Sequence, residues 1–384
     1  MSELVVNVSN IVSPLCYTVL KLEPYTACPF NCAYCYSRWY SRGPSAGTAP
    51  REHVVKLFES TARYIYRKGL KPIPFRLSTL VDPFPPSEEL SKVSERILGV
   101  AEGFEYPLII NTKSSRIVEA DSAKKALERL LDKGLAVVQI SLSTLEDSNA
   151  KLLEPAAPPP SKRLLVISEL GSSGYPVVIR LSPFIPGFSL ASEEEVEVAM
   201  SAFKDMGVKH VVVEALRVEK EATEWLVEKL GLGGLEFEGY SVREVEGGSP
   251  VVRVSRRQRV EAYSLLYKYA TRLGVGFSTC KEGLFRFHTT DDCCGAYMLK
   301  ASYGLRATLW DLYRARLDPL RSVFDGVELN RVCKQFSRLC GELLKHYPRV
   351  ISKPLRYHEK RLLKVLKERD VLQRVAPDIV SAST

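Results

Sequence analysis

The sequence lacks the marks of a membrane or secreted protein. None of its apolar stretches approaches the roughly 18 uncharged residues that a bilayer-spanning helix needs. The first ten residues, MSELVVNVSN, lack the basic and apolar segments of a signal peptide. Nine cysteines in 384 residues do not suggest the disulfide framework of a small secreted domain. We therefore expect a cytoplasmic protein with no membrane contact, in which clustered cysteines bind metal.

Most of the chain also lacks net charge. Residues 1–299 balance to zero, whereas residues 300–384 hold 18 Lys and Arg against 9 Asp and Glu, which is the whole net charge of +9. A basic appendage on a neutral body favours a polyanionic partner such as nucleic acid. The alternative is a solvated helical surface laced with salt bridges.

Strands and helices alternate through the first 215 residues. Apolar, β-branched runs predict strands at 15–22, 73–80, 107–112, 135–142, 176–182 and 209–215. Helical periodicity separates them at 51–68, 87–101, 119–133, 161–171 and 191–206. Continuous apolar strands are typical of a parallel sheet covered by helices, so the pattern predicts an α/β fold, either an open sheet or a barrel.

The pattern loosens after residue 215. The Gly-rich stretch 231–250 is expected to be irregular, and a helix at 255–273 leads to a last strand at 275–279. From about residue 300 the chain is predicted to be mainly helical, with residues 356–369 forming the most basic helix.

Three cysteines stand close together just after the first predicted strand. Cys28, Cys32 and Cys35 form a C-x3-C-x2-C array with Tyr34 before the last cysteine, and no fourth ligand follows nearby. A [4Fe–4S] cluster normally takes four thiolates, so three local cysteines would leave one iron open for chemistry. The alternatives are a structural zinc knuckle, which usually requires four ligands, and three buried thiols.

This array resembles the signature of the radical S-adenosylmethionine (SAM) enzymes. The resemblance implies that Cys28, Cys32 and Cys35 hold a [4Fe–4S] cluster whose fourth iron binds SAM. It also implies reductive cleavage of SAM to a 5′-deoxyadenosyl radical that abstracts hydrogen, and an electron donor such as ferredoxin or flavodoxin. The six strand–helix units fit the partial (β/α)6 TIM-like barrel of that superfamily, where chemistry occurs at the C-terminal ends of strands.

Motifs at the strand ends resemble the spore-photolyase-like branch of the superfamily, whose members are often described as DNA repair photolyase-like. The resemblance implies that Lys113 and Ser141 bind the SAM carboxylate, that Tyr34 lies near the adenine and that Asp82 meets the amino group; Arg180 transfers more weakly. The motifs are Glu-Pro-Tyr before the cysteines, Val-Asp-Pro-Phe (81–84), Thr-Lys-Ser-Ser (112–115), Ser-Leu-Ser-Thr-Leu-Glu (141–146), Leu-Glu-Pro-Ala-Ala-Pro (153–158) and Arg-Leu-Ser-Pro-Phe-Ile-Pro-Gly (180–187).

A second group of cysteines follows the last predicted strand. Cys280, Cys293 and Cys294 lie within fifteen positions, and Cys333 and Cys340 come later. The first three could bind a second iron–sulfur cluster or metal, or supply a thiol that returns hydrogen to a substrate radical. They could also be small buried hydrophobic residues.

These observations predict an N-terminal segment (1–14), a radical SAM barrel (15–280) with its cluster loop at 28–35, and a basic helical extension with a cysteine-containing loop (281–384). The favoured function is a radical SAM enzyme, a lyase or modification enzyme, acting on nucleic acid in DNA repair or base modification. The alternatives are a radical SAM enzyme with an auxiliary cluster acting on a peptide or small metabolite, and a non-catalytic, metal-stabilised nucleic-acid-binding protein.

Overall fold

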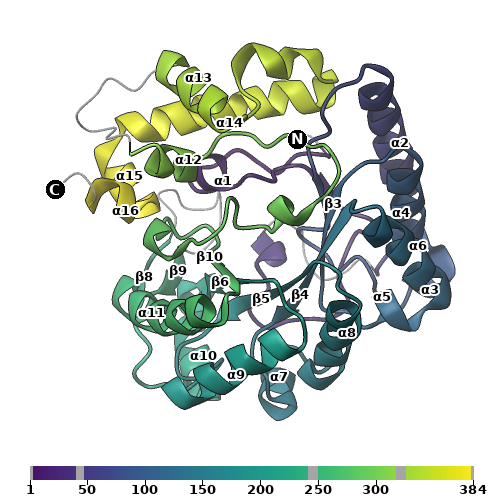
Figure 1. Ribbon diagram of the computed structural model, residues 1–384. Coiled ribbons are helices and arrows are strands. Elements are labelled where there is room, and N and C mark those ends of the chain that lie inside the picture. Colours follow the sequence, from purple (N-terminus) through teal and green to yellow (C-terminus); the bar gives the residue numbers. More distant parts are fainter. Residues whose placement is uncertain (1–2, 40–46, 241–249, 317–325, 382–384) are drawn as a thin grey trace.

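The computed structural model describes residues 3–39, 47–240, 250–316 and 326–381, and its centre is one parallel sheet. Seven strands follow the order β1-β2-β3-β4-β5-β6-β10, and all neighbours are parallel. Their bounds are β1 Lys21–Leu22, β2 Phe75–Leu77, β3 Leu108–Thr112, β4 Ala136–Leu142, β5 Val177–Phe184, β6 His210–Ala215 and β10 Gly276–Thr279. The sheet curves as an incomplete barrel (Figure 1).

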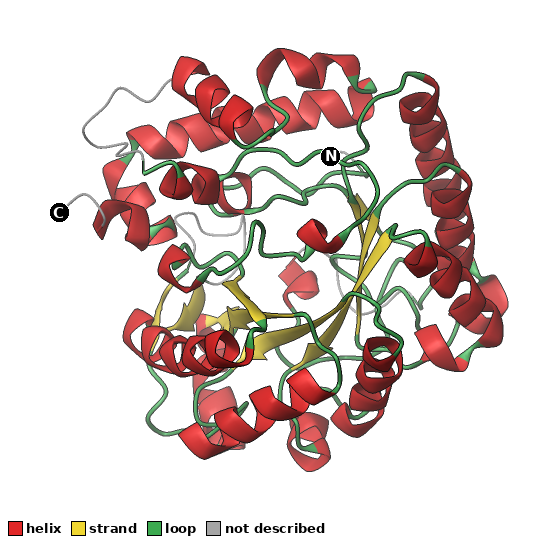
Figure 2. Cartoon of the chain, in the orientation of Figure 1, coloured by secondary structure: helices red, strands yellow, loops and turns green. Residues whose placement is uncertain are grey.

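Amphipathic helices cover the outside of this sheet (Figure 2). In α2, for example, Val54, Phe58 and Ile65 face the core, as the period of 3.6 residues requires. The long covering helices are α2 Glu52–Arg67, α4 Val93–Gly103, α6 Asp121–Asp132, α8 Pro160–Ser172, α9 Glu193–Asp205 and α11 Arg256–Leu273. Shorter ones are α3 Glu88–Ser91, α5 Arg116–Glu119, α7 Asp147–Leu153 and α10 Thr223–Leu230.

The predicted partial barrel is confirmed, with several corrections of detail. The first strand is much shorter than expected: α1 Val12–Leu15 takes its first residue, and Leu20 forms an isolated antiparallel bridge with Val5. The final strand, β10, pairs with β6 and makes the sheet seven-stranded.

The stretch expected to be irregular contains a strand instead. Strand β8 Phe237–Gly239 joins β7 Arg217–Glu219 and β9 Val251–Val254 in a small antiparallel sheet with β9 in the middle. The rest of the Gly-rich stretch, 241–249, lies outside the described residues.

The C-terminal part is mainly helical, as predicted, and shares a core with the barrel. Its helices are α12 Leu309–Arg314, α13 Gly326–Gln335, α14 Arg349–Lys367, α15 Arg369–Val375 and α16 Pro377–Ser381. Side chains from the inner faces of four strands, Ile109, Val137, Val178 and Val212, belong to the same buried cluster as Leu362 and Leu372. Helix α1 packs on α14 beside it (Figure 1).

One polar contact joins the two ends of the chain in this layer. The buried His358 ring of α14 is hydrogen-bonded to the Ser13 hydroxyl and to the Val6 carbonyl, at 2.9 Å each. Within the described ranges, no helix combines the length and apolar character needed to cross a membrane.

Because barrel and extension share this core, a cavity in α15 should destabilise the whole protein. Leu372 is fully buried, so Leu372→Ala should lower the free energy of unfolding by about 2–5 kcal/mol in one transition. Chemical denaturation followed by circular dichroism measures this effect. Leu343→Ala is the matched control, since Leu343 is 54% exposed and should change stability by less than about 0.5 kcal/mol. Equal effects, or a separate early transition for Leu372→Ala, would contradict the shared core.

Candidate active site

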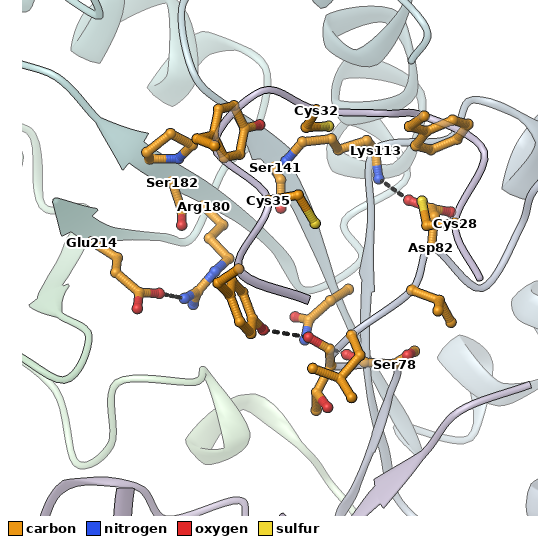
Figure 3. Close-up of a pocket in the computed structure, with 18 of the residues that line it drawn as sticks. Cys28, Cys32, Cys35, Ser78, Asp82, Lys113, Ser141, Arg180, Ser182 and Glu214 are labelled. Carbon is orange, nitrogen blue, oxygen red and sulfur yellow. Dashed lines mark hydrogen bonds and ion pairs between the residues drawn. The ribbon is translucent and has the colours of Figure 1, made fainter. Parts of the chain in front are cut away.

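A pocket lies at the C-terminal ends of β2 to β6, and the cysteine loop forms one of its walls (Figure 3). All eight residues predicted to bind the cluster or SAM line it. They are Cys28, Cys32, Tyr34, Cys35, Asp82, Lys113, Ser141 and Arg180. Residues up to 152 positions apart in the sequence therefore meet at the edge of the sheet where parallel strands place their functional side chains.

Short contacts fix the cysteine loop to its surroundings. The Ala33 amide donates to the Leu153 carbonyl (2.8 Å) at the end of α7, and Phe30 is buried. Asn31 adopts a left-handed backbone conformation (φ 49°), which Asn tolerates better than most residues, so the chain turns between the first two cysteines. The Tyr36 hydroxyl donates to the Thr79 carbonyl and joins the end of the loop to the segment after β2.

The donor set of this loop fits an iron–sulfur cluster. The three cysteines form no disulfide, are partly accessible and line one pocket. Burial raises the pKa of Cys28 to about 11 and that of Cys32 to about 12, with Lys113 opposing the rise at Cys32. Since metal binds the thiolate, cluster assembly must release protons.

Glu154 is the central carboxylate behind the loop. It is buried, receives hydrogen bonds from the Tyr34 hydroxyl and the Arg163 guanidinium, and lies 3.9 Å from the Lys113 ammonium. Burial alone would raise the pKa of Glu154, but Lys113 and Arg163 overcome it and hold the pKa below its usual value. Arg163 also donates to the Ser141 carbonyl (2.9 Å), so one buried carboxylate positions three of the predicted cofactor-binding residues.

Asp82 points mainly at the protein. Its carboxylate accepts hydrogen bonds from the Phe84 amide (3.0 Å), the Thr112 hydroxyl (2.8 Å) and the Lys113 amide (2.7 Å; Figure 3). A carboxylate has about four acceptor directions, so about one is left for a ligand. The structure thus gives Asp82 a positioning role at the ends of β2 and β3 beside its predicted contact with the SAM amino group.

The opposite wall of the pocket is strongly cationic. Glu214 at the end of β6 binds Arg180 and Arg217, and its oxygen lies 3.2 Å from the Lys281 ammonium. These three cations hold the pKa of Glu214 far below its usual value, even though burial would raise it. Arg76 of β2 also lines this wall.

The second cysteine group lies behind this wall. Cys280, Cys293 and Cys294 are buried and close together, with 3.8 Å between the sulfurs of Cys293 and Cys294. Arg180 Nη2 lies 3.4 Å from Cys280 Sγ. Cys333 and Cys340 are joined by a disulfide instead.

The pKa values of these thiols shift in different directions. A hydrogen bond from Cys293 lowers the pKa of Cys280 despite burial, with help from Arg180 and Lys281. The hydrogen bond that Cys293 donates to Cys280, together with burial, raises the pKa of Cys293. A thiol donor or a second cluster here stays a prediction.

Sequence reasoning did not assign roles to several residues of this site. Glu23 accepts hydrogen bonds from the Ser78 and Thr79 hydroxyls and from the Thr79 and Leu80 amides, and so fixes the segment after β2. Glu23 and Glu154 each precede a proline within a noted motif, which was the available signal. Arg76 and Lys281 had no such signal, because their contacts join residues far apart in the sequence.

The family comparison agrees with this geometry. Residues 22–202 match the family model of the Radical SAM superfamily. This part of the chain belongs to the radical SAM superfamily. The superfamily uses a [4Fe–4S] cluster and SAM, so the predicted superfamily and its cofactors are confirmed for these residues.

Two relatives come from viruses. The chain is 31% identical over 143 residues to protein ORF301 of Acidianus two-tailed virus, covering 36% of this chain and 45% of that one. It is 23% identical over 264 residues to the radical SAM Nα-GlyT isomerase of Pseudomonas phage M6, covering 68% of this chain and 53% of that one. The chain thus spans about half the length of each.

The solved structure of spore photoproduct lyase with dinucleoside spore photoproduct shares the fold. Its TM-score is 0.52 at 14% identity, covering 68% of this chain and 77% of that one. A variant of the same lyase was solved with bound AdoMet and dinucleoside spore photoproduct, at a TM-score of 0.51 and 14% identity, covering 68% of this chain and 76% of that one. This similarity supports the partial-barrel fold, and the photolyase-like branch stays a prediction from the motifs.

Loss of the Glu154 charge should disturb SAM binding without touching the cluster ligands. Glu154→Gln leaves Lys113 and Arg163 without their shared anion, and we expect about tenfold to hundredfold weaker SAM binding. Calorimetric titration of the anaerobically reconstituted protein measures this. Glu146→Gln, an exposed carboxylate near the start of α7, is the control and should bind like the wild type. Unchanged affinity in Glu154→Gln would refute the positioning role.

Proposed function

We propose that this protein cleaves SAM reductively and uses the resulting radical to abstract hydrogen from a nucleic-acid substrate, in DNA repair or base modification. The observation that carries the proposal is the convergence of Cys28, Cys32 and Cys35 with Lys113 and Ser141 in one pocket. When bound, the [4Fe–4S] cluster and SAM supply the electron transfer and the 5′-deoxyadenosyl radical.

The residues of the chain would bind and orient the cluster and SAM. Cys28, Cys32 and Cys35 would hold the cluster as thiolates, and three thiolates would leave one of its four irons without a protein ligand. The Lys113 ammonium, held by Glu154 and lying 5.7 Å from the Tyr34 ring centre, is placed to bind the SAM carboxylate together with the Ser141 hydroxyl. Phe30 and Tyr36 cover the pocket beside the cysteines and restrict water, which protects a reactive radical.

A stripe on α14 supports a nucleic-acid partner. Six exposed basic residues lie on this helix at intervals of three and four, and so share one face. They are Arg349, Lys353, Arg356, Lys360, Lys364 and Lys367. The face is about 27 Å long at 1.5 Å per residue, and we call it the basic stripe. Among its members, Lys364 pairs with Glu368 at 3.5 Å.

The aromatic residues of the extension give less support. Trp310 and Tyr347 are buried and pack inside it, whereas Tyr357 beside the basic stripe is half exposed. Phosphate contacts therefore carry more of the argument than base stacking. The names of two similar proteins also favour a nucleic-acid substrate. One is a lyase that was solved with a dinucleoside spore photoproduct, and the other is the Nα-GlyT isomerase of a phage. The electron donor, such as ferredoxin or flavodoxin, and a cytoplasmic location stay predictions.

The catalytic half of the proposal is tested by product analysis. Anaerobically reconstituted protein, reduced with dithionite in the presence of SAM, should release 5′-deoxyadenosine. Cys32→Ala removes one of the three thiolates and should lower this release at least about a hundredfold. Chromatography of the quenched reaction measures it, and Cys16→Ala, which changes a buried thiol in the core outside the loop, is the control. A fully loaded wild type that makes no deoxyadenosine would contradict the proposal.

The nucleic-acid half is tested by salt dependence. Replacing Lys353, Arg356 and Lys360 with Gln removes three exposed charges of the basic stripe. The slope of log affinity against log salt for duplex DNA should then fall by about 2 to 3. Fluorescence anisotropy over a range of salt concentrations measures this slope. The same change at Lys125, Arg129 and Lys133, three exposed residues at intervals of four in and just after α6, is the matched control. Equal slopes for both triple variants would refute the basic stripe as the contact surface.

A further inference from the structure

The cationic wall of the pocket carries more positive charge than its own anions neutralise. Four cations lie on it, Arg76, Arg180, Arg217 and Lys281, against one carboxylate, Glu214. Cys280 Sγ lies behind the wall, 3.4 Å from Arg180 Nη2. The wall therefore has more cationic side chains than carboxylates in a largely buried site, where an unpaired charge is costly.

Two guanidinium groups on this wall also have unused donors. Arg180 gives Nη2 to Glu214, but its Nη1 has no partner among the described residues. Arg76 gives Nη2 to the Gln139 side chain at 3.4 Å, while its Nε has none. Both side chains are more than nine-tenths buried and line the pocket. Each donor is left unsatisfied, although buried N–H groups nearly always find an acceptor.

The two guanidinium groups belong to one layer inside the barrel. Arg76 projects from β2 and Arg180 from β5, and Gln139 of β4 reaches Arg76 from between them. The groups lie close enough to repel each other electrostatically. Like charges are tolerated side by side when an anion binds between them, and planar guanidinium groups match the oxygens of carboxylate and phosphate.

We propose that Arg76 and Arg180 form an oxyanion-binding subsite, and that the substrate carries a carboxylate or phosphate group that binds there. Carboxylate and phosphate share this recognition chemistry. The inference rests on the proposed function in that the subsite adjoins the SAM pocket. It adds the class of group by which the substrate is held, on the wall facing away from Glu154 and Lys113.

Calorimetric titration of the reconstituted protein with SAM already bound tests the subsite. In the proposed function SAM binds Lys113 and Ser141, and Arg180, which the resemblance assigned to SAM only weakly, is left with Arg76 for a small anion. The titrants are sodium acetate, inorganic phosphate and acetamide, the last being a neutral isostere of acetate. We expect one equivalent of acetate or phosphate to bind at least about tenfold more tightly than acetamide. The stronger of the two anions identifies the substrate group.

Variants locate the binding. Arg76→Gln should weaken anion binding about tenfold or more, Arg76→Lys should restore part of it, and Arg180→Gln should act in the same direction. Arg129→Gln on the outer surface is the control, and thermal melting shows which variants are folded. Anions that bind no better than acetamide, or that bind folded Arg76→Gln with wild-type affinity, overturn the subsite.

The same wild-type samples separate this proposal from the proposed function. Deoxyadenosine release without anion binding would overturn the subsite and leave SAM cleavage standing. Anion binding without deoxyadenosine release would leave the subsite standing and overturn SAM cleavage.

Discussion

The buried charge of Glu154 is the interaction on which the proposed site depends. One carboxylate holds the Lys113 ammonium, the Arg163 guanidinium and the Tyr34 hydroxyl, and through Arg163 it reaches the backbone of Ser141. Removing one partner from such a network leaves a buried charge uncompensated, which costs about 3–5 kcal/mol. The predicted cofactor-binding side chains are therefore held in place before any ligand arrives, and little order has to be gained on binding.

The pocket divides into two electrostatic halves. On the cysteine side, Lys113 and Arg163 both form ion pairs with Glu154. On the opposite side, Glu214 is shared by three cations and Arg76 adds a fourth. The first half suits a cofactor that the protein always needs, because Glu154 already holds its side chains in place. The second half is incomplete without an anion, which is expected of a site for a changing ligand.

The features of the fold and the site that could be predicted are those indicated by short sequence motifs. The cluster loop shows itself by the spacing of Cys28, Cys32 and Cys35, and Lys113 and Ser141 stand out because polar residues end apolar strands. The short length of β1 and the presence of β8 were not predicted, because tertiary contacts override strand propensity in segments of two or three residues. Arg76 and Lys281 could not be predicted, because their roles come from partners that only the curved sheet brings together.

The central claim is that three cysteines hold a cluster with one iron open to the SAM pocket. Electron paramagnetic resonance of the dithionite-reduced, reconstituted protein, recorded with and without SAM, tests it most directly. The account predicts that SAM changes the signal of the reduced cluster, because SAM binds the open iron. The same concentration of SAM should change the signal of the Glu154→Gln variant less. A fully loaded cluster whose signal is identical with and without SAM would contradict the account.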